Sequence, residues 1–230
     1  MSRINNDCQI FITDIQAFSN NLERYINLLP CEEREKALRF RRAEDRLRSI
    51  TGALLIRACA GKFLGSSKIQ IVRNEFGKPF IKDSQGFNFS LSHSANLVVL
   101  AVAKNSVGVD VEEIRPIQWQ DIAGRFCEQE QQLITEDENP LDCFYKIWTI
   151  REAFAKEEGI GLSIFDNDGS SIKICYCDNY IKYHGRTLYI HTLRLGSYRI
   201  SVCSNTPDSP GLNIVNENFI LNMQEYSHGR

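Results

Sequence analysis

Residues 107–112 read Val-Gly-Val-Asp-Val-Glu, and the interpretation of the whole chain starts from this stretch. Successive side chains of a strand alternate between its two faces, so Asp110 and Glu112 share one face while Val109 and Val111 point into the core. Two neighbouring carboxylates repel each other unless a cation lies between them, and oxygen ligands suit magnesium or manganese rather than zinc. The stretch therefore predicts a strand with a divalent metal site, although an ordinary half-exposed strand has the same pattern.

A strong helical pattern follows, and residues 148–156 read Trp-Thr-Ile-Arg-Glu-Ala-Phe-Ala-Lys. Residues four apart share a helix face, which places Glu152 beside Lys156 and Trp148 one turn earlier. Glu152 is then a candidate third metal ligand or general base, and Lys156 a candidate phosphate clamp. A surface ion pair on an amphipathic helix gives the same spacing, so the spacing does not choose between these roles.

Two weaker motifs precede the strand predicted at 107–112. Pro79 biases Lys78 toward an extended conformation and Gly77 permits close approach, so a ligand could meet backbone and ammonium together. His93 stands between Ser92 and another serine, where it could bind an anion. Taken singly, Gly-Lys-Pro is a common turn, and a lone histidine is more often structural.

The element pattern occurs twice along the chain. A strand at 8–15 is followed by one long helix from about 31 to 63, and its polar face is strongly basic. Further strands are expected at 69–72, 79–82, 87–92 and 97–103, the last two as a hairpin. A second round has a strand at 107–112, helices to about 159, and strands near 172–175, 188–193 and 198–203. This order predicts an α+β protein, and the polar stretch 205–230 is expected to be a loosely held tail.

Composition excludes several classes. The 230 residues are 43% hydrophobic and 24% charged, which is typical of a globular protein. The net charge of −2 argues against a generic nucleic-acid binder. The longest apolar stretch, 97–103, is too short to span a bilayer and the first residues do not resemble a secretory signal, so a cytosolic protein is expected. The eight cysteines are scattered, and Cys175 and Cys177 lack a second pair to complete a zinc site, so free thiols are expected.

In chain order, the basic helix, Gly-Lys-Pro, Ser-His-Ser, Gly-Val-Asp-Val-Glu and Trp-Thr-x-x-Glu-Ala-x-x-x-Lys closely resemble the 4′-phosphopantetheinyl transferase superfamily. The resemblance is to its long, single-chain type, which activates nonribosomal peptide, polyketide or fatty-acid synthases. It implies two similar lobes in a pseudo-twofold arrangement, each a helix packed on a small, mainly antiparallel sheet. The expected divisions are an N-terminal lobe at 1–106, a C-terminal lobe at 107–204 and a tail at 205–230.

The resemblance also implies a substrate and roles for individual residues. The substrate is coenzyme A, bound between the lobes, and the acceptor is a serine of an apo acyl or peptidyl carrier protein. Monomers that bind neither nucleic acid nor membrane are expected. The implied metal ligands for Mg²⁺, with Mn²⁺ as the alternative, are Asp110, Glu112 and Glu152. The implied coenzyme A contacts are Lys156 at the pyrophosphate, Lys78 and Pro79 at the adenine, and Ser92, His93, Arg48 and Lys36 at the 3′-phosphate.

The resemblance leaves the general base and two departures open. Glu152 is the first candidate for the base and Glu130 the second, and the helical region 118–132 is expected to help receive the carrier. Arg151 stands where family members commonly have lysine, and Glu33 where some carry a basic residue. A metal-dependent phosphohydrolase or nuclease, and an inactive carrier-binding module, are the alternatives to a transferase.

Overall fold

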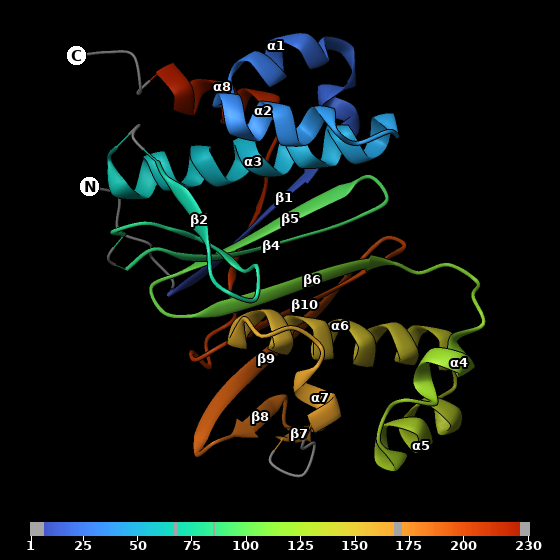
Figure 1. The fold of residues 1–230 in the computed structure, drawn as a ribbon. Coiled ribbons are helices and arrows are strands. Elements are labelled where there is room, and N and C mark those ends of the chain that lie inside the picture. Colours follow the sequence, from blue (N-terminus) through green and yellow to red (C-terminus); the bar gives the residue numbers. More distant parts are fainter. Residues whose placement is uncertain (1–6, 67–68, 85, 168–171, 226–230) are drawn as a thin grey trace.

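The computed structural model describes residues 7–66, 69–84, 86–167 and 172–225, and its ribbon shows two lobes stacked on one another (Figure 1). Each lobe packs helices on a mainly antiparallel sheet, which confirms the predicted α+β class. The predicted division points after residues 106 and 204 stay predictions.

The sheet of the first lobe has the strand order β11-β1-β5-β4. Neighbours pair antiparallel except β11, which lies parallel to β1. The predicted hairpin is confirmed, because β4 and β5 pair from Asn88 opposite Ala103 to Ser94 opposite Leu97. The strands are β1 (Cys8–Asp14), β4 (Asn88–Ser94), β5 (Leu97–Ala103) and β11 (Gly211–Ile214), with a separate hairpin of β2 (Ile71–Arg73) and β3 (Pro79–Ile81).

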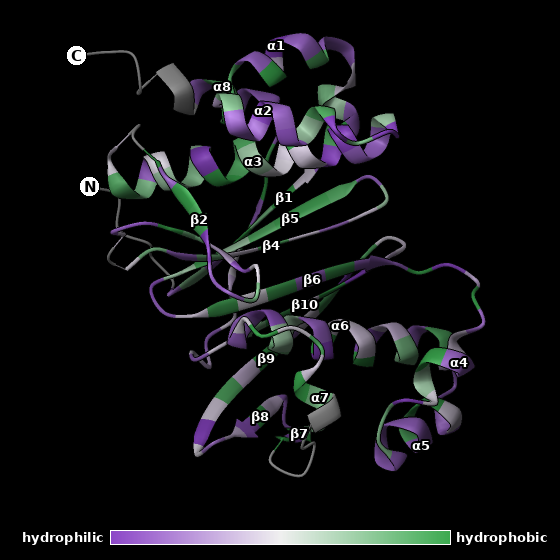
Figure 2. Cartoon of the chain, in the orientation of Figure 1, coloured by the Kyte–Doolittle hydropathy of each residue, from purple (hydrophilic) through white to green (hydrophobic). Residues whose placement is uncertain are grey.

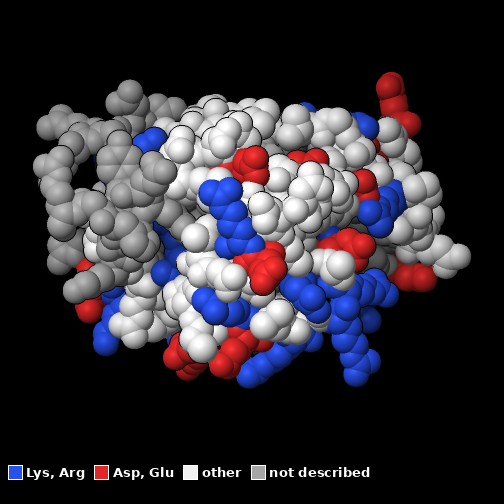
Figure 3. All heavy atoms as spheres, turned by 90° about the horizontal axis from the view of Figure 1, so that it is seen from above, with Lys and Arg blue, Asp and Glu red and all other residues white. Residues whose placement is uncertain are grey.

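Helices cover the outer face of this sheet (Figure 1). The longest, α3, packs on β5, and residues Ile50, Leu54 and Leu55 on it are wholly buried. Acidic and basic side chains are interspersed over the surface that these helices form (Figure 3). The elements are η1 (Ile15–Asn21), α1 (Leu22–Asn27), α2 (Cys31–Leu38), α3 (Ala43–Leu64) and α8 (Glu217–Glu225).

The second lobe has a five-stranded antiparallel sheet in the order β6-β10-β9-β8-β7. Helix α6 packs against β6 and β10. The strands are β6 (Val107–Glu113), β7 (Ile172–Cys175), β8 (Tyr180–Tyr183), β9 (Arg186–Leu195) and β10 (Tyr198–Ser204), and the helices are α4 (Trp119–Ala123), α5 (Glu128–Glu136), α6 (Pro140–Glu158) and α7 (Ile164–Asn167).

An apolar layer joins the two sheets. Val99 and Ala101 of β5 pack in one buried cluster with Val109, Val111 and Val202 of the second sheet. Burying this much branched aliphatic surface favours association of the lobes by roughly 25 cal/mol for each Å² removed from water. Strand β5 is coloured hydrophobic along its length, whereas the helices show both colours (Figure 2).

The predicted single helix over 31–63 is wrong, because α2 ends at Leu38 and α3 begins at Ala43. Arg42 has extended dihedral angles, φ −83° and ψ 137°, and directly precedes α3. Arg39, Arg41 and Arg42 are all exposed, so a continuous helix here would place like charges on adjacent turns without burying any apolar surface. A break therefore costs little at this point.

The predicted loosely held tail is also wrong over its described part. Residues 211–214 form β11 on the edge of the first sheet, and α8 packs against α3. The polar composition of the stretch hides single apolar residues that enter the core, of which Ile220 is fully buried. Among the described residues, no helix is both long and apolar enough to cross a membrane.

Candidate active site

The predicted alternation along β6 is confirmed. Val109 and Val111 enter the layer between the sheets, while Asp110 and Glu112 lie on the face toward α6. Gly108 makes this close packing possible, because a Cβ there would lie 1.8 Å from the carbonyl oxygen of Ala153 in α6. Only glycine fits at this position, which brings the carboxylates of β6 against the helix.

Helix α6 brings Glu152 and Lys156 to the place where β4, β6 and α6 meet, which we call the seam. The side chain of Asn139 caps its first turn, and Gly159 ends it with φ 77°. The Lys156 ammonium lies 2.6 Å from Asp110 Oδ1 and 3.0 Å from Ser92 Oγ. The helix thus supplies both a cation and a further carboxylate to the strand.

A ladder of three serines on β4 joins the lobes at this seam. The hydroxyl oxygens of Ser90, Ser92 and Ser94 accept hydrogen bonds from the backbone N–H groups of Val109, Val111 and Glu113, at 3.1, 3.4 and 3.1 Å. The edge of β6 is therefore paired by side chains rather than by a neighbouring backbone.

The same serines hold the carboxylates. Ser92 donates to Asp110 Oδ1 and Ser94 donates to Glu112 Oε2, each at 2.7 Å. One hydroxyl donates once and accepts twice, so each of these two serines can fix a backbone N–H and a carboxylate together. The sequence analysis did not assign Ser94 to the site. Serine at alternate positions of β4 shows that the three hydroxyl groups share a face, but not what they contact.

Asp110 is 3% exposed, and its two carboxylate oxygens differ in their contacts. Oδ1 contacts Lys156 and Ser92, whereas Oδ2 is buried without a hydrogen-bond partner. A buried carboxylate oxygen without a partner carries a free-energy cost that a cation would remove.

The other two carboxylates are electrostatically linked to Asp110. Burial raises the pKa of Glu112, and Asp110 raises it further, against a hydrogen bond from Ser94. Burial likewise raises the pKa of Glu152, with further contributions from Asp110 and Glu112. Repulsion from neighbouring carboxylates thus contributes to the raised pKa of both glutamates, and a divalent cation would reduce this repulsion.

The donor set fits a hard cation. Three carboxylates and one unused oxygen suit magnesium or manganese. The carboxylate oxygens of Asp110, Glu112 and Glu152 do not all lie within 4.8 Å of one another, so they are spaced more widely than ligands of one ion. In the described part of the chain, Cys175, Cys177 and Asp178 form the one trio of potential ligands whose atoms all lie within 4.8 Å of one another.

The predicted 3′-phosphate residues separate into two groups. Arg48 and His93 lie near one another, since partial burial and then the Arg48 charge lower the pKa of His93. Arg48 is held 2.7 Å from the Ala95 carbonyl oxygen and 2.5 Å from Asp45. Lys36 instead has its pKa lowered by partial burial and by Arg73. No hydrogen bond or ion pair between described residues joins Lys36 to Arg48 or His93.

Lys78 connects the two lobes. Its ammonium donates to the carbonyl oxygen of Glu157 at 2.8 Å, and its stem lies against Gly159. Burial lowers the pKa of Lys78. Pro79 begins β3 opposite Arg73. The expected adenine contact of Lys78 and Pro79 stays a prediction, and in the structure the ammonium caps the end of α6.

Both departures from the family pattern have structural partners. Glu33 binds Arg57 through two contacts of 2.6 and 2.9 Å. Arg151 is buried, lies 2.7 Å from Glu130 Oε2 and stacks on the Phe165 ring. Arg151 therefore stabilises the interior of the second lobe, on a different face of α6 from Glu152.

Glu130, the second candidate base, has structural partners on both of its oxygens, and its role as a base stays a prediction. It is 2% exposed, and besides Arg151 it accepts hydrogen bonds from the Tyr176 hydroxyl and from the Cys127 backbone N–H. Both oxygens are thus occupied by structural donors, and Glu152 stays the first candidate.

Together, the fold and the seam define a class: a two-lobed α+β enzyme in which carboxylates, a lysine and hydroxyl groups meet where the lobes join. Comparison with known proteins makes this specific. Residues 16–105 match the family model "4′-phosphopantetheinyl transferase, N-terminal", and residues 106–203 match "4′-phosphopantetheinyl transferase superfamily". The chain belongs to the 4′-phosphopantetheinyl transferase superfamily.

Individual relatives support the same conclusion. The chain is 32% identical to 4′-phosphopantetheinyl transferase Sfp of Bacillus subtilis, over 82% of this chain and 87% of that protein. It is 29% identical to 4′-phosphopantetheinyl transferase gsp of Aneurinibacillus migulanus, over 80% and 82% of the two chains. The relative HetI from Nostoc is 32% identical over 59% of this chain and 61% of its own length.

Proposed function

We propose that the protein transfers the 4′-phosphopantetheine arm of coenzyme A to a serine of an apo acyl or peptidyl carrier protein and releases 3′,5′-ADP. The single observation that carries the proposal is Asp110, because its Oδ1 binds Lys156 while its Oδ2 is buried and unpartnered at the seam of this fold. The ammonium that we propose to bind phosphate and the oxygen that we propose to bind the metal are therefore joined through one carboxylate.

Asp110, Glu112 and Glu152 would hold the divalent ion, which we propose to be Mg²⁺. When bound, the ion supplies charge neutralisation at the pyrophosphate of coenzyme A. The carboxylates would close in from their present spacing, and their raised pKa values at Glu112 and Glu152 would fall once the ion offsets their repulsion.

Lys156 is positioned for the transferring phosphate. It reaches the seam from α6 and is already held by Asp110 and Ser92, so its ammonium needs little reorganisation. A cation fixed where negative charge develops stabilises the transition state more than the ground state. Arg48 and His93 would contact the 3′-phosphate at the other end of the nucleotide.

The transfer needs a base and a leaving group. The carrier serine oxygen forms a bond to the phosphorus next to the pantetheine arm, and the bond from that phosphorus to the bridging oxygen of 3′,5′-ADP breaks. The serine proton would pass to Glu152, directly or through a water.

Mass spectrometry of the acceptor tests the proposal. The protein is mixed with an apo carrier, coenzyme A and Mg²⁺, and the carrier is expected to gain the mass of phosphopantetheine. Asp110→Asn should lose at least about 100-fold in rate, or roughly 3 kcal/mol of transition-state stabilisation. Glu113→Gln is the matched control, because Glu113 is also an acidic residue of β6 but pairs with Arg115 instead.

Other outcomes would refute the transferase. Nucleotide cleavage with an unmodified carrier would indicate a phosphohydrolase, and carrier binding without modification would indicate an inactive module.

We further propose that the enzyme acts as a monomer in the cytosol. All eight cysteines are free thiols, which suits a reducing compartment.

A further inference from the structure

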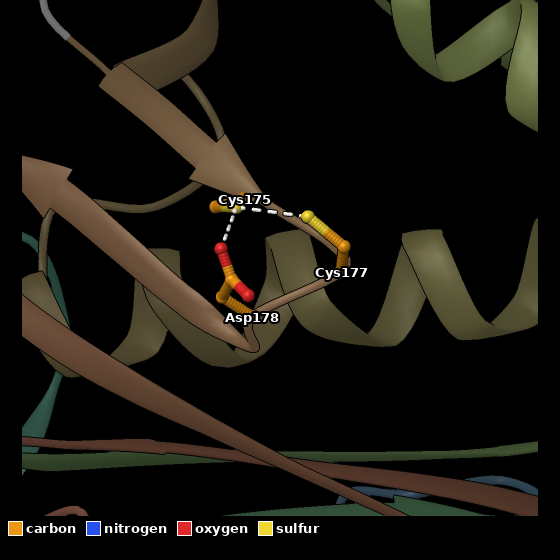
Figure 4. A group of neighbouring side chains, drawn as sticks. All are labelled: Cys175, Cys177 and Asp178. Atoms are coloured by element: carbon orange, nitrogen blue, oxygen red, sulfur yellow. Dashed lines mark hydrogen bonds between the residues drawn. The ribbon is translucent and has the colours of Figure 1, made fainter.

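A second cluster of potential ligands lies at the far edge of the second sheet. Cys175 ends β7, and Cys177 and Asp178 stand in the turn that leads to β8. The three side chains point toward one another across this turn (Figure 4). In the strand order β6-β10-β9-β8-β7 they are at the opposite edge from Asp110, so the two groups are separate sites.

The ligand atoms are already close together. The two sulfur atoms are 3.3 Å apart, and Cys175 Sγ is 3.3 Å from Asp178 Oδ2. All three ligand atoms lie within 4.8 Å of one another. On a tetrahedral zinc ion, two thiolates would lie about 3.8 Å apart and a thiolate and a carboxylate oxygen about 3.6 Å apart. The two contacts of Cys175 would therefore each lengthen by roughly half an ångström or less on binding the ion.

The ligand types select a different metal from that of the candidate active site. Thiolates favour borderline and soft ions such as Zn²⁺, whereas Mg²⁺ requires oxygen ligands. Sequence spacing alone argued against zinc, because Cys175 and Cys177 lack a second cysteine pair. The structure adds Asp178 as a third potential ligand, which the cysteine spacing does not indicate.

We propose that Cys175, Cys177 and Asp178 bind one Zn²⁺ ion, with water in the fourth position. Cys177 and Asp178 are exposed and Cys175 is half-buried, so the ion can enter from solvent. Binding replaces each S–H bond by a sulfur–zinc bond and releases two protons to solvent. An open coordination position makes the ion exchangeable, unlike a closed four-cysteine site.

The surroundings of the turn can accommodate this ion. A cavity of about 480 Å³ borders it, lined by Cys175 and Cys177 and also by Cys127. Between the two ligands, Tyr176 turns inward and donates its hydroxyl hydrogen bond to Glu130. This hydrogen bond anchors the turn to α5 between its two cysteines.

Cobalt substitution tests the site. Reduced, full-length, tag-free protein is titrated with Co²⁺, and one equivalent is expected to produce a thiolate-to-cobalt charge-transfer band that Zn²⁺ then abolishes. Cys177→Ser and Asp178→Asn should each weaken binding by at least about 10-fold. The matched control is Cys31→Ser, since Cys31 is also exposed but its thiol contacts Glu35.

Two results would overturn the proposal. Unchanged metal affinity in both Cys177→Ser and Asp178→Asn would place the ion elsewhere. Formation of a Cys175–Cys177 disulfide, with no metal bound by the reduced protein, would show that the pair is a redox site. Phosphopantetheine transfer with Mg²⁺ should stay unchanged in both variants, which separates failure of this proposal from failure of the transferase assignment.

Discussion

Single side chains at the seam combine structural and chemical roles. Ser92 accepts a hydrogen bond from the β6 backbone, donates to Asp110 and accepts from Lys156. The resemblance to 4′-phosphopantetheinyl transferases implies that this serine contacts the 3′-phosphate of coenzyme A, whereas its observed partners are the groups that join the lobes. The proposed substrate contact would therefore share one hydroxyl with the contact between the lobes.

The proposed contact of Arg48 with the 3′-phosphate of coenzyme A can be tested by substitution. Arg48→Gln should weaken coenzyme A binding by about 10-fold, or roughly 1.4 kcal/mol, because it removes a charge held close to His93. Isothermal titration calorimetry measures the change. Arg41→Gln, an exposed residue between α2 and α3, is the control. Equal affinity in the two variants would remove Arg48 from the site.

Glu157 provides a pH prediction near the end of α6. Burial raises the pKa of Glu157 to about 7, and Glu158 raises it while Arg186 and Lys78 lower it. Between about pH 4.5 and 7 the unfolded state loses this proton and the folded state keeps it, so the free energy of unfolding falls as pH rises through that window.

Glu157→Gln should reduce this slope, and the raised pKa values of Glu112 and Glu152 should maintain the remainder. Urea unfolding at pH 5 and pH 8 should show a loss on the order of 3 kcal/mol in the parent protein, and a smaller loss in the variant. Glu128→Gln, at an exposed position of α5, should keep the parent's slope. An identical pH dependence in parent and Glu157→Gln would mean that Glu157 is ionised throughout.

At the scale of elements, one glycine sets the distance between β6 and α6. Gly108→Ala should destabilise the protein by at least about 3 kcal/mol, because the new Cβ would overlap backbone atoms of α6. Gly61→Ala in α3 is the control, since its Cβ would lie 3.6 Å from the carbonyl oxygen of Ser66, an ordinary van der Waals contact, and alanine favours helix. Thermal unfolding measures both, and wild-type stability of Gly108→Ala would contradict the close approach.

Local patterns predicted the elements that the chain builds from neighbouring residues. Strict alternation placed β6 and the β4–β5 hairpin, and the four-residue spacing placed Glu152 beside Lys156. The serine ladder was not predictable, because the partners of Ser90 and Ser94 come from the other lobe. The same holds for Glu130, whose partners Arg151 and Tyr176 are far from it in sequence.

At the scale of the whole molecule, the first lobe is closed by the end of the chain. After β10 the chain returns, adds β11 beside β1 and ends its described part with α8 on α3. The Tyr25 hydroxyl also donates to Glu217 at the start of α8. Sequence composition could not show this return, because a polar segment with few buried residues resembles a tail.

Ile220 tests whether this return supports the fold. It is fully buried among helices of the first lobe, so Ile220→Ala should cost about 2–5 kcal/mol through lost burial and the cavity left behind. Ile214→Ala is the control, because Ile214 on β11 is 72% exposed and should change stability little. Urea unfolding compares the two variants. A stability loss equal in both variants would show that α8 does not anchor the lobe.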